Sequence, residues 1–181
     1  MTNNNRGGFL NPESIVKEFG LKQGMQVADF GCGAGYFTIA MAKLVGEEGN
    51  IYALDVLKTA LESVRSRAKI EGLLNIRTIW ANLELKGGSK LEDESMDLVL
   101  LANILFQSSK KVSIIREAKR VLKKGGKMIV IEWKARQPFG PPEDLIVDKD
   151  LIKEKIEKEG FVFSKEIPAG HNHWGLVFIK S

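Results

Sequence analysis

Apolar residues recur along this chain in two alternating rhythms, and the alternation predicts its secondary structure. Short continuous apolar runs bounded by glycine or polar residues predict buried strands, whereas apolar residues three or four positions apart predict amphipathic helices. The predicted strands cover residues 26–30, 51–54, 76–80, 97–102, 128–131, 161–167 and 174–179. The predicted helices cover residues 36–45, 58–71, 108–122 and 148–159, after a short helix that begins at Asn11 and Pro12 and ends at Gly20.

Strands that alternate with helices predict one α/β domain. Parallel neighbours need a crossover connection, so the first five strands are expected to form a parallel sheet with helices on both faces. The last two strands are joined by the short segment 168–173 and are expected to pair antiparallel. The domain is predicted to cover residues 11–181, after a flexible tail of residues 1–10. A glycine cap at Gly125-Gly126 is expected to end the helix 108–122.

The composition is that of a soluble globular protein. The 181 residues are 44% apolar and 28% charged, which excludes an intrinsically disordered chain. The single cysteine, Cys32, excludes an internal disulfide and a multi-cysteine zinc site. The longest apolar run, 98–106, is too short to span a bilayer, and residues 1–8 lack the apolar core of a signal peptide. We therefore expect a cytoplasmic protein.

The formal net charge of +4 is mildly basic and permits contact with nucleic acid. Basic residues gather in the predicted helix 108–122, at Lys110, Lys111, Arg116, Lys119 and Arg120. They form no long lysine or arginine block, so solvated helix faces account for most of these charges. Contact with nucleic acid stays open as an alternative.

A glycine-dense turn between the first strand and the next helix carries the clearest chemistry. It reads Asp29-Phe30-Gly31-Cys32-Gly33-Ala34-Gly35. Glycine at alternate positions lets the backbone adopt positive φ and lets a ligand approach without a Cβ in the way. The following helix points its free N–H groups and its positive dipole end at the turn. The turn is therefore predicted to seat a nucleotide-like cofactor.

Two details distinguish this turn from the fingerprint of dinucleotide-binding proteins. Tyr36 or Phe37 stands where that fingerprint has its third glycine, at the start of the helix. Asp29 lies two positions before the first glycine, where a carboxylate would repel a pyrophosphate and attract an ammonium group. Asp55 follows the second strand, where an acid can accept both hydroxyl protons of a ribose. The alternative for Asp55 is a cap on the next helix.

Together these residues resemble a known family. Asp29 through Gly35, Asp55, Asn82, Asp97 and Lys124-Gly125-Gly126 are similar to the motif set of the class I S-adenosylmethionine-dependent methyltransferases. Within them the chain looks most like the small proteins related to ubiquinone and menaquinone biosynthesis. The resemblance implies a Rossmann-like, seven-stranded, mostly parallel sheet of order 3-2-1-4-5-7-6 with the last strand antiparallel. It also implies S-adenosylmethionine as cofactor, S-adenosylhomocysteine as product, and direct in-line methyl transfer to a small molecule.

The resemblance and the ends of the strands indicate which residues would bind the cofactor. These are Asp29, Gly31, Gly33, Gly35, Asp55, Val56, Asn82, Leu83 and Asn103. The glycines would lie beneath the methionine and ribose parts, and Asp55 would hold the ribose hydroxyls. Val56, Asn82 and Leu83 would surround the adenine, and Asn103 would lie by the methionyl end. Asp97 begins its strand and is interpreted as structural.

The residues of the acceptor side are less defined. Alignment of an activated methyl group is sufficient for transfer, and a base is needed only where the acceptor must lose a proton. His171 and His173, with one residue between them in an extended segment, would share a face and are the catalytic candidates. The alternative is a turn in which the histidines are exposed or hydrogen-bonded. A zinc site is disfavoured, because two histidine ligands are too few to hold the metal.

Three further residues are candidates for contact with the substrate. Phe106 and Trp133 would stack on a planar molecule, with core packing as the alternative. Glu132 would make a polar contact, with a salt bridge to a lysine as the alternative. The segment 102–107 lacks the Pro-Pro tetrapeptide of nucleic-acid amino-methyltransferases and the histidines common in quinone methyltransferases, which argues against a quinone acceptor. The segment 5–10 is expected to fold over the site.

Three other functions stay open from the sequence. An RNA or protein methyltransferase would use the basic helix 108–122. An NAD-binding oxidoreductase would share the architecture, and a non-enzymatic relative would bind the cofactor and regulate a partner.

Overall fold

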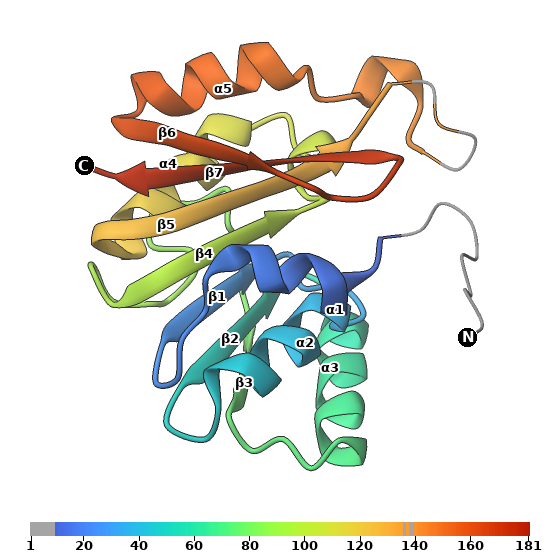
Figure 1. Ribbon diagram of the computed structural model, residues 1–181, viewed down its shortest axis with the longest axis vertical. Coiled ribbons are helices and arrows are strands. Elements are labelled where there is room, and N and C mark those ends of the chain that lie inside the picture. Colours follow the sequence, from blue (N-terminus) through green and yellow to red (C-terminus); the bar gives the residue numbers. More distant parts are fainter. Residues whose placement is uncertain (1–9, 136, 138–139) are drawn as a thin grey trace.

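The computed structural model describes residues 10–135, 137 and 140–181 and shows one seven-stranded sheet flanked by helices (Figure 1). The order of the strands is β3-β2-β1-β4-β5-β7-β6, as the family resemblance implies. Strands β1 to β5 run parallel, and β7 pairs antiparallel with both β5 and β6. The strands are β1 Gln26–Phe30, β2 Asn50–Asp55, β3 Ile76–Trp80, β4 Met96–Ala102, β5 Leu122–Trp133, β6 Phe161–Ile167 and β7 His173–Lys180.

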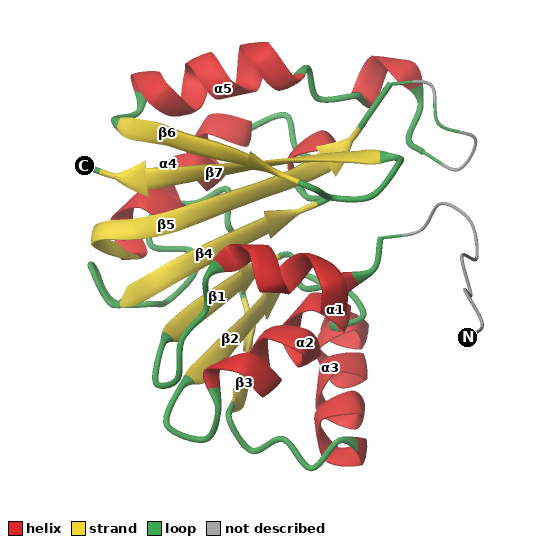
Figure 2. Cartoon of the chain, in the orientation of Figure 1, coloured by secondary structure: helices red, strands yellow, loops and turns green. Residues whose placement is uncertain are grey.

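Helices cover both faces of the sheet (Figure 2). They are α1 Pro12–Ile15, α2 Tyr36–Val45, α3 Lys58–Ile70, α4 Lys111–Val121 and α5 Lys149–Lys158. Short 3-10 helices follow α1 at Val16–Phe19 and lie at Leu105–Gln107 and Glu143–Leu145. None of the helices in the described part of the chain has the length and apolarity to cross a membrane.

The side chains of β1 show why this strand lies at the centre. Val27 packs with α1 and α2 on one face of the sheet, whereas Ala28 and Phe30 pack with α4 and α5 on the other. Successive residues of a strand point to opposite faces, so a strand covered on both sides is apolar throughout. The carboxyl end of β1 is thereby fixed between two layers of helix, and the glycine turn follows directly.

The largest difference from the predicted elements lies between α4 and β5. The predicted helix 108–122 with its glycine cap is wrong at both ends, because α4 begins at Lys111 and β5 begins directly at Leu122. Gly125, at φ +76°, lies within β5 at a bulge, where the pairing with β4 jumps from Met96–Leu122 to Leu98–Lys127. Leu122 is fully buried, so packing of this residue outweighs the local signal for a helix end.

Asp97 stabilises this end of the sheet, as the sequence suggested. Its Oδ2 accepts the N–H of Gln26 (2.8 Å), and its Oδ1 pairs with the Lys123 ammonium (2.6 Å). The predicted tail 1–10 and the predicted cover over the site, residues 5–10, lie outside the described residues except for Leu10.

Candidate functional site

The glycine turn joins β1 to α2 and is fastened to β2. The N–H groups of Gly31 and Cys32 both donate to the Leu54 carbonyl (2.8 and 3.0 Å). Gly31, Gly33 and Gly35 all adopt positive φ, at +75°, +49° and +84°. This left-handed backbone favours glycine at all three positions.

The three glycines differ in what surrounds them. A Cβ on Gly31 would come within 2.6 Å of Ile104, and a Cβ on Gly35 within 2.8 Å of Val64. A Cβ on Gly33 would meet no described atom within 4 Å. Gly31 and Gly35 are therefore required by packing, whereas Gly33 opens onto empty space.

That space is a cavity of about 540 Å³, which we call the β2-side cavity. Its walls come from the glycine turn and from the segments that follow β2, β3 and β4. They include these predicted residues: Gly31, Gly33, Asp55, Val56, Asn82 and Leu83. Residues that lie far apart in sequence meet here because parallel strands end at one edge of the sheet.

A second cavity, of about 530 Å³, lies on the other side of Gly31, and we call it the β5-side cavity. It brings together these predicted residues: Asp29, Gly31, Asn103, Trp133 and His173. Gly31 lines both cavities, so the two spaces meet at the glycine turn.

Sequence reasoning missed several walls of the β5-side cavity. Tyr36 and Phe37 line it from the first turn of α2, which the glycine turn alone could have indicated. Pro12, the first residue of α1, lines it as well and carries no local signal for such a place. Leu10 also lines it and is the one described residue of the segment 5–10, which is expected from the sequence to fold over the site.

Asp55 braces the glycine turn. Its Oδ2 accepts the N–H of Gly33 (3.0 Å) and its Oδ1 accepts the N–H of Leu57 (2.9 Å). Leu57 is the N-cap residue of α3, so Asp55 lies two residues before that cap and fixes the start of the helix by accepting the Leu57 N–H. A carboxylate offers about four lone-pair positions, so two acceptor positions stay free for a ligand.

Asp29 is a buried acid. Its Oδ2 accepts the hydroxyl proton of Thr38 (2.5 Å) from α2. Burial raises the pKa of Asp29 to about 7, opposed by the Thr38 hydrogen bond and assisted by the nearby Asp55 charge. The carboxylate is therefore half charged near neutral pH until a cation approaches it.

Asp29 gives stability a defined dependence on pH. Its pKa is 3.8 in the unfolded chain and about 7 in the folded protein, so the folded state binds the proton more tightly and stability falls as pH rises from 4 to 7. We expect Asp29→Asn to remove this loss. When pH is raised from 5 to 8, the free energy of unfolding of wild type should fall by about 2–3 kcal/mol more than that of the variant. Urea unfolding of both proteins at the two pH values measures the difference. If the free energy of unfolding changes equally with pH in wild type and variant, the raised pKa of Asp29 is wrong.

Asn103 lies at the turn after β4. Its backbone has φ +55°, and its N–H donates to the Ile131 carbonyl (2.8 Å). The side-chain Oδ1 is buried and accepts no hydrogen bond from the described residues. Buried polar atoms normally have a partner, so this oxygen, on a residue that lines the β5-side cavity, is a candidate contact for a ligand.

Glu132 and Phe106 are placed differently from the other predicted residues. Glu132 is fully buried and its Oε1 accepts the N–H of Leu105 (2.6 Å). Burial raises its pKa to about 7. Phe106 packs against the core beneath α4. Among the described residues neither side chain lines the two cavities; Glu132 instead anchors the turn that carries Ile104 over Gly31.

The two histidines do not share an environment. His173 is the first residue of β7, is 3% exposed, and its ring centroid lies 4.1 Å from that of Trp133. His171 is exposed on the bend before β7, where its carbonyl accepts the Lys134 ammonium (3.1 Å). The predicted common face is wrong, because side chains alternate regularly only within a strand and His171 lies outside it.

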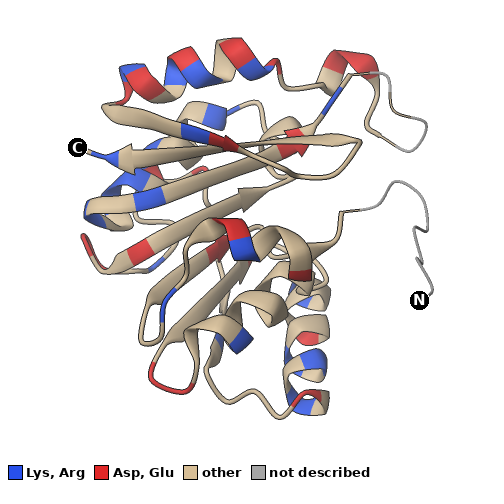
Figure 3. Cartoon of the chain, in the orientation of Figure 1, with Lys and Arg blue, Asp and Glu red and all other residues tan. Residues whose placement is uncertain are grey.

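The basic side chains of α4 are held by neighbours: Lys111 and Lys119 donate to backbone carbonyls, and the two arginines pair with acids. Arg116 pairs with Glu159 (2.8 Å), and Arg120 pairs with Glu117 (2.7 Å) and with Asp93. Figure 3 shows acidic and basic positions interspersed along the helices and strands of the chain. These charges tie α4 to its surroundings, which gives the nucleic-acid alternative no support.

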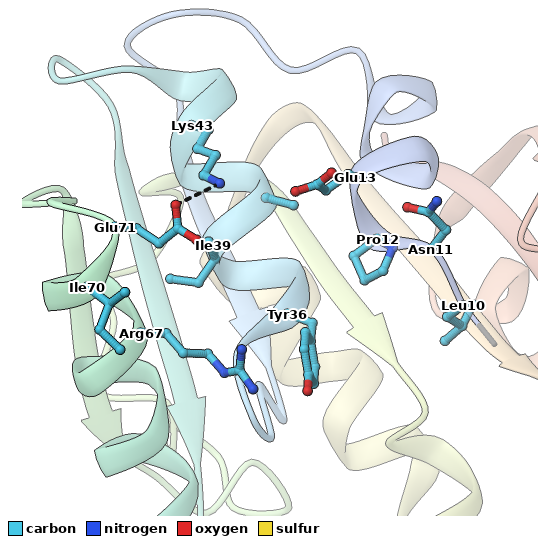
Figure 4. Close-up of a pocket in the computed structure, with 11 residues that line it drawn as sticks. Leu10, Asn11, Pro12, Glu13, Tyr36, Ile39, Lys43, Arg67, Ile70 and Glu71 are labelled. Atoms are coloured by element: carbon cyan, nitrogen blue, oxygen red, sulfur yellow. Dashed lines mark ion pairs between the residues drawn. The ribbon is translucent and has the colours of Figure 1, made fainter. Parts of the chain in front are cut away.

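A third cavity, of about 550 Å³, lies between α1, α2 and α3 (Figure 4). The Arg67 guanidinium lies over the Tyr36 ring, 4.1 Å from its centroid, and Lys43 pairs with Glu71 at 3.0 Å. This cavity shares Leu10, Pro12 and Tyr36 with the β5-side cavity, so the two adjoin at the beginnings of α1 and α2.

Comparison with solved structures agrees with this architecture. A structure described as a SAM dependent methyltransferase from Aquifex aeolicus superposes with a TM-score of 0.86 at 28% identity. The match covers 95% of this chain and 90% of that one.

The sequence of this chain is also similar to two curated methyltransferases and matches a family model. A demethylmenaquinone methyltransferase of Geobacillus stearothermophilus is 29% identical over 129 residues, which are 71% of this chain and 53% of the relative. A ubiquinone/menaquinone biosynthesis C-methyltransferase of Shewanella sp. (strain ANA-3) is 30% identical over 155 residues, 83% of this chain and 58% of the relative. The chain thus spans somewhat more than half the length of these relatives. The family model for the methyltransferase domain matches residues 21–175, and the chain belongs to this family.

Proposed function

We propose that this protein is an S-adenosylmethionine-dependent methyltransferase that acts on a small molecule by direct in-line methyl transfer. The observation that carries the proposal is the pair of cavities that meet at Gly31, with Asp55 in one and Asp29 in the other. A donor made of a nucleoside and a charged amino acid has two ends that match these two acids. Membership of the methyltransferase domain family supports the same conclusion.

The β2-side cavity suits the adenosine part. Gly33 leaves open the space that a Cβ would fill, and the free acceptor positions of Asp55 suit the two ribose hydroxyls. Val56 and Leu83 offer apolar surface to the adenine ring, and Asn82 offers an amide to its polar edge.

The β5-side cavity suits the methionyl part. Asp29 faces it with a buried carboxyl group whose charge an ammonium would stabilise. The unpartnered Oδ1 of Asn103 adds a second acceptor at the same cavity. Gly31, between the two cavities, would lie beneath the bound donor, and Gly35 fixes the start of α2 behind it.

When bound, S-adenosylmethionine supplies a methyl group that its positive sulfur has already activated. The chain's own task is then to align the acceptor with that group and to exclude water. Alignment of two reactants can contribute about 7–11 kcal/mol to the barrier. The buried walls of the β5-side cavity, from Phe37 to His173, suit that task.

A small molecule is the acceptor that the site favours. The quinone names of the two relatives belong to proteins of which this chain spans little more than half, and the segment 102–107 lacks the histidines common in quinone methyltransferases. Arg116 and Arg120, two of the basic residues that the RNA alternative would use, already pair with acids. The acid Asp29 stands where a dinucleotide would place its phosphates, which disfavours an NAD-binding oxidoreductase.

Titration calorimetry on the full chain tests the proposal. We expect S-adenosylmethionine and S-adenosylhomocysteine to bind, and NAD to give no heat of binding. At a ligand concentration of 100 times Kd, the bound protein should gain about 2.7 kcal/mol of stability against unfolding. Binding of NAD with no binding of either sulfur compound would refute the assignment.

A further inference from the structure

The β5-side cavity has a distinct chemical character. Four of the residues that line it are aromatic: Tyr36, Phe37, Trp133 and His173. Within the described part of the chain, its lining contains neither lysine nor arginine. An aromatic cavity without a cation favours a planar molecule that carries no negative charge.

His173 is the unexplained group of this cavity. The residue is 3% exposed, and neither ring nitrogen has a hydrogen-bond partner among the described residues. A buried polar group without a partner costs about 1–3 kcal/mol, and such exceptions gather at functional sites. An incoming ligand that donates a hydrogen bond to the imidazole would give one of the two ring nitrogens a partner and recover part of this cost.

The fold holds the imidazole in one place. His173 is paired with Trp133 across β5 and β7, and the two rings lie in contact. Burial and the nearby Lys134 lower the pKa of His173 to about 4, so the ring is neutral at physiological pH. A neutral imidazole has one nitrogen that accepts a proton.

We propose that the β5-side cavity binds an uncharged aromatic hydroxyl compound, that His173 accepts its hydroxyl proton, and that the methyl group is transferred to its oxygen. This inference rests on the proposed function. The oxygen lone pair forms the new bond to the methyl carbon, and the carbon–sulfur bond of the donor breaks with its electron pair left on sulfur. The hydroxyl proton passes to His173 and then to solvent.

Other acceptors fit the cavity less well. An acceptor with a carboxylate or phosphate would add a further negative charge beside Asp29 and the donor's own carboxylate, and it would meet no lysine or arginine of the described lining. An alkyl amine has a pKa of about 10.4 and would enter as a cation, for which Asp29 and not His173 is the partner. A carbon acceptor has no polar proton to offer the imidazole. An aromatic hydroxyl carries a polar proton that becomes strongly acidic as its oxygen is methylated, and the neutral imidazole can accept that proton.

The experiment measures binding and product separately. Uncharged phenols and naphthols, with 2-naphthol as the reference, are titrated into the free protein and into the protein loaded with S-adenosylhomocysteine. The same compounds are then incubated with donor labelled with carbon-13 in its methyl group, and NMR distinguishes an O-methyl from a C-methyl product. The matched compounds are 2-naphthylamine, 2-methoxynaphthalene and 6-hydroxy-2-naphthoate. We expect tight binding and O-methylation only of the uncharged hydroxyl compounds.

Variants of the two histidines test the residue. His173→Phe keeps the ring against Trp133 but removes the acceptor, and His173→Gln keeps a hydrogen-bonding group without a base. We expect both to lower kcat about 100-fold with the affinity for S-adenosylhomocysteine unchanged. His173→Phe should also weaken 2-naphthol binding about 10-fold. His171→Gln, on the exposed bend outside both cavities, is the matched control and should behave as wild type.

Each contrary result has one meaning. If the protein binds S-adenosylhomocysteine but methylates no uncharged phenol or naphthol, or forms C-methyl products, the acceptor class is wrong. If both His173 variants keep wild-type kcat and 2-naphthol affinity, the role of His173 is wrong. If 2-naphthol binding depends on His173 but neither sulfur compound binds, the proposed function fails while the acceptor site stands.

Discussion

Replacing Asp55 by alanine is expected to weaken the binding of S-adenosylmethionine about 1000-fold, or about 4 kcal/mol. The carboxylate would lose two hydrogen bonds to the ribose hydroxyls, and each bond to a charged group contributes about 1.5–3 kcal/mol. It would also release the Gly33 N–H, which it holds at 3.0 Å, so the glycine turn would lose its brace. Calorimetry with both sulfur compounds measures the loss.

Asp148→Ala is the matched control for Asp55→Ala. Asp148 also accepts a backbone N–H at the start of a helix, from Leu151 at 2.8 Å, and it lies at α5, away from the glycine turn. We expect a similar small loss of stability and unchanged affinity. If Asp55→Ala binds the cofactor as tightly as Asp148→Ala does, the ribose role of Asp55 is wrong.

Replacing Gly33 by alanine is expected to reduce cofactor affinity at least about 100-fold while the protein stays folded. A Cβ at this position meets no described atom within 4 Å, so the protein itself tolerates the methyl group. That methyl group would occupy the β2-side cavity where the backbone is proposed to approach the ligand. The positive φ of +49° adds a stability cost of about 1–2 kcal/mol.

Gly72→Ala separates the backbone cost from the loss of binding. Gly72 has φ +66° and likewise meets no described atom within 4 Å of a built Cβ, but it lies exposed after α3. Thermal unfolding should show similar destabilisation of the two variants, whereas calorimetry should show a loss of affinity only for Gly33→Ala. Equal affinities would mean that the ligand does not approach Gly33.

The sequence anticipates the proximity of those predicted site residues whose positions are set by local chain geometry. The three glycines of the turn lie within five consecutive residues, 31–35, and Asp55 ends the neighbouring strand β2. The carboxyl ends of β1 and β2 must meet once the sheet is parallel. Gly31, Gly33 and Asp55 therefore come together in the β2-side cavity, as expected.

Other features depend on distant partners and carry no local signal. Gly125-Gly126 looks like a helix cap, but pairing of Leu122 with Met96 turns the segment into a strand. His173 is buried and His171 is exposed, and this difference depends on where β7 begins and on Trp133, which lies far away in the sequence. The burial of Glu132 depends on the turn that follows β4.

The insertion of β7 between β5 and β6 has a consequence for synthesis on the ribosome. β6 joins the sheet only through β7, although β6 is made first. Until residues 173–180 emerge, the edge of β5 stays open to pairing with other chains, a known route to aggregation. The same strand brings His173 to Trp133. The nascent chain can therefore form its glycine turn early, but the β5-side cavity is completed only when β7 docks.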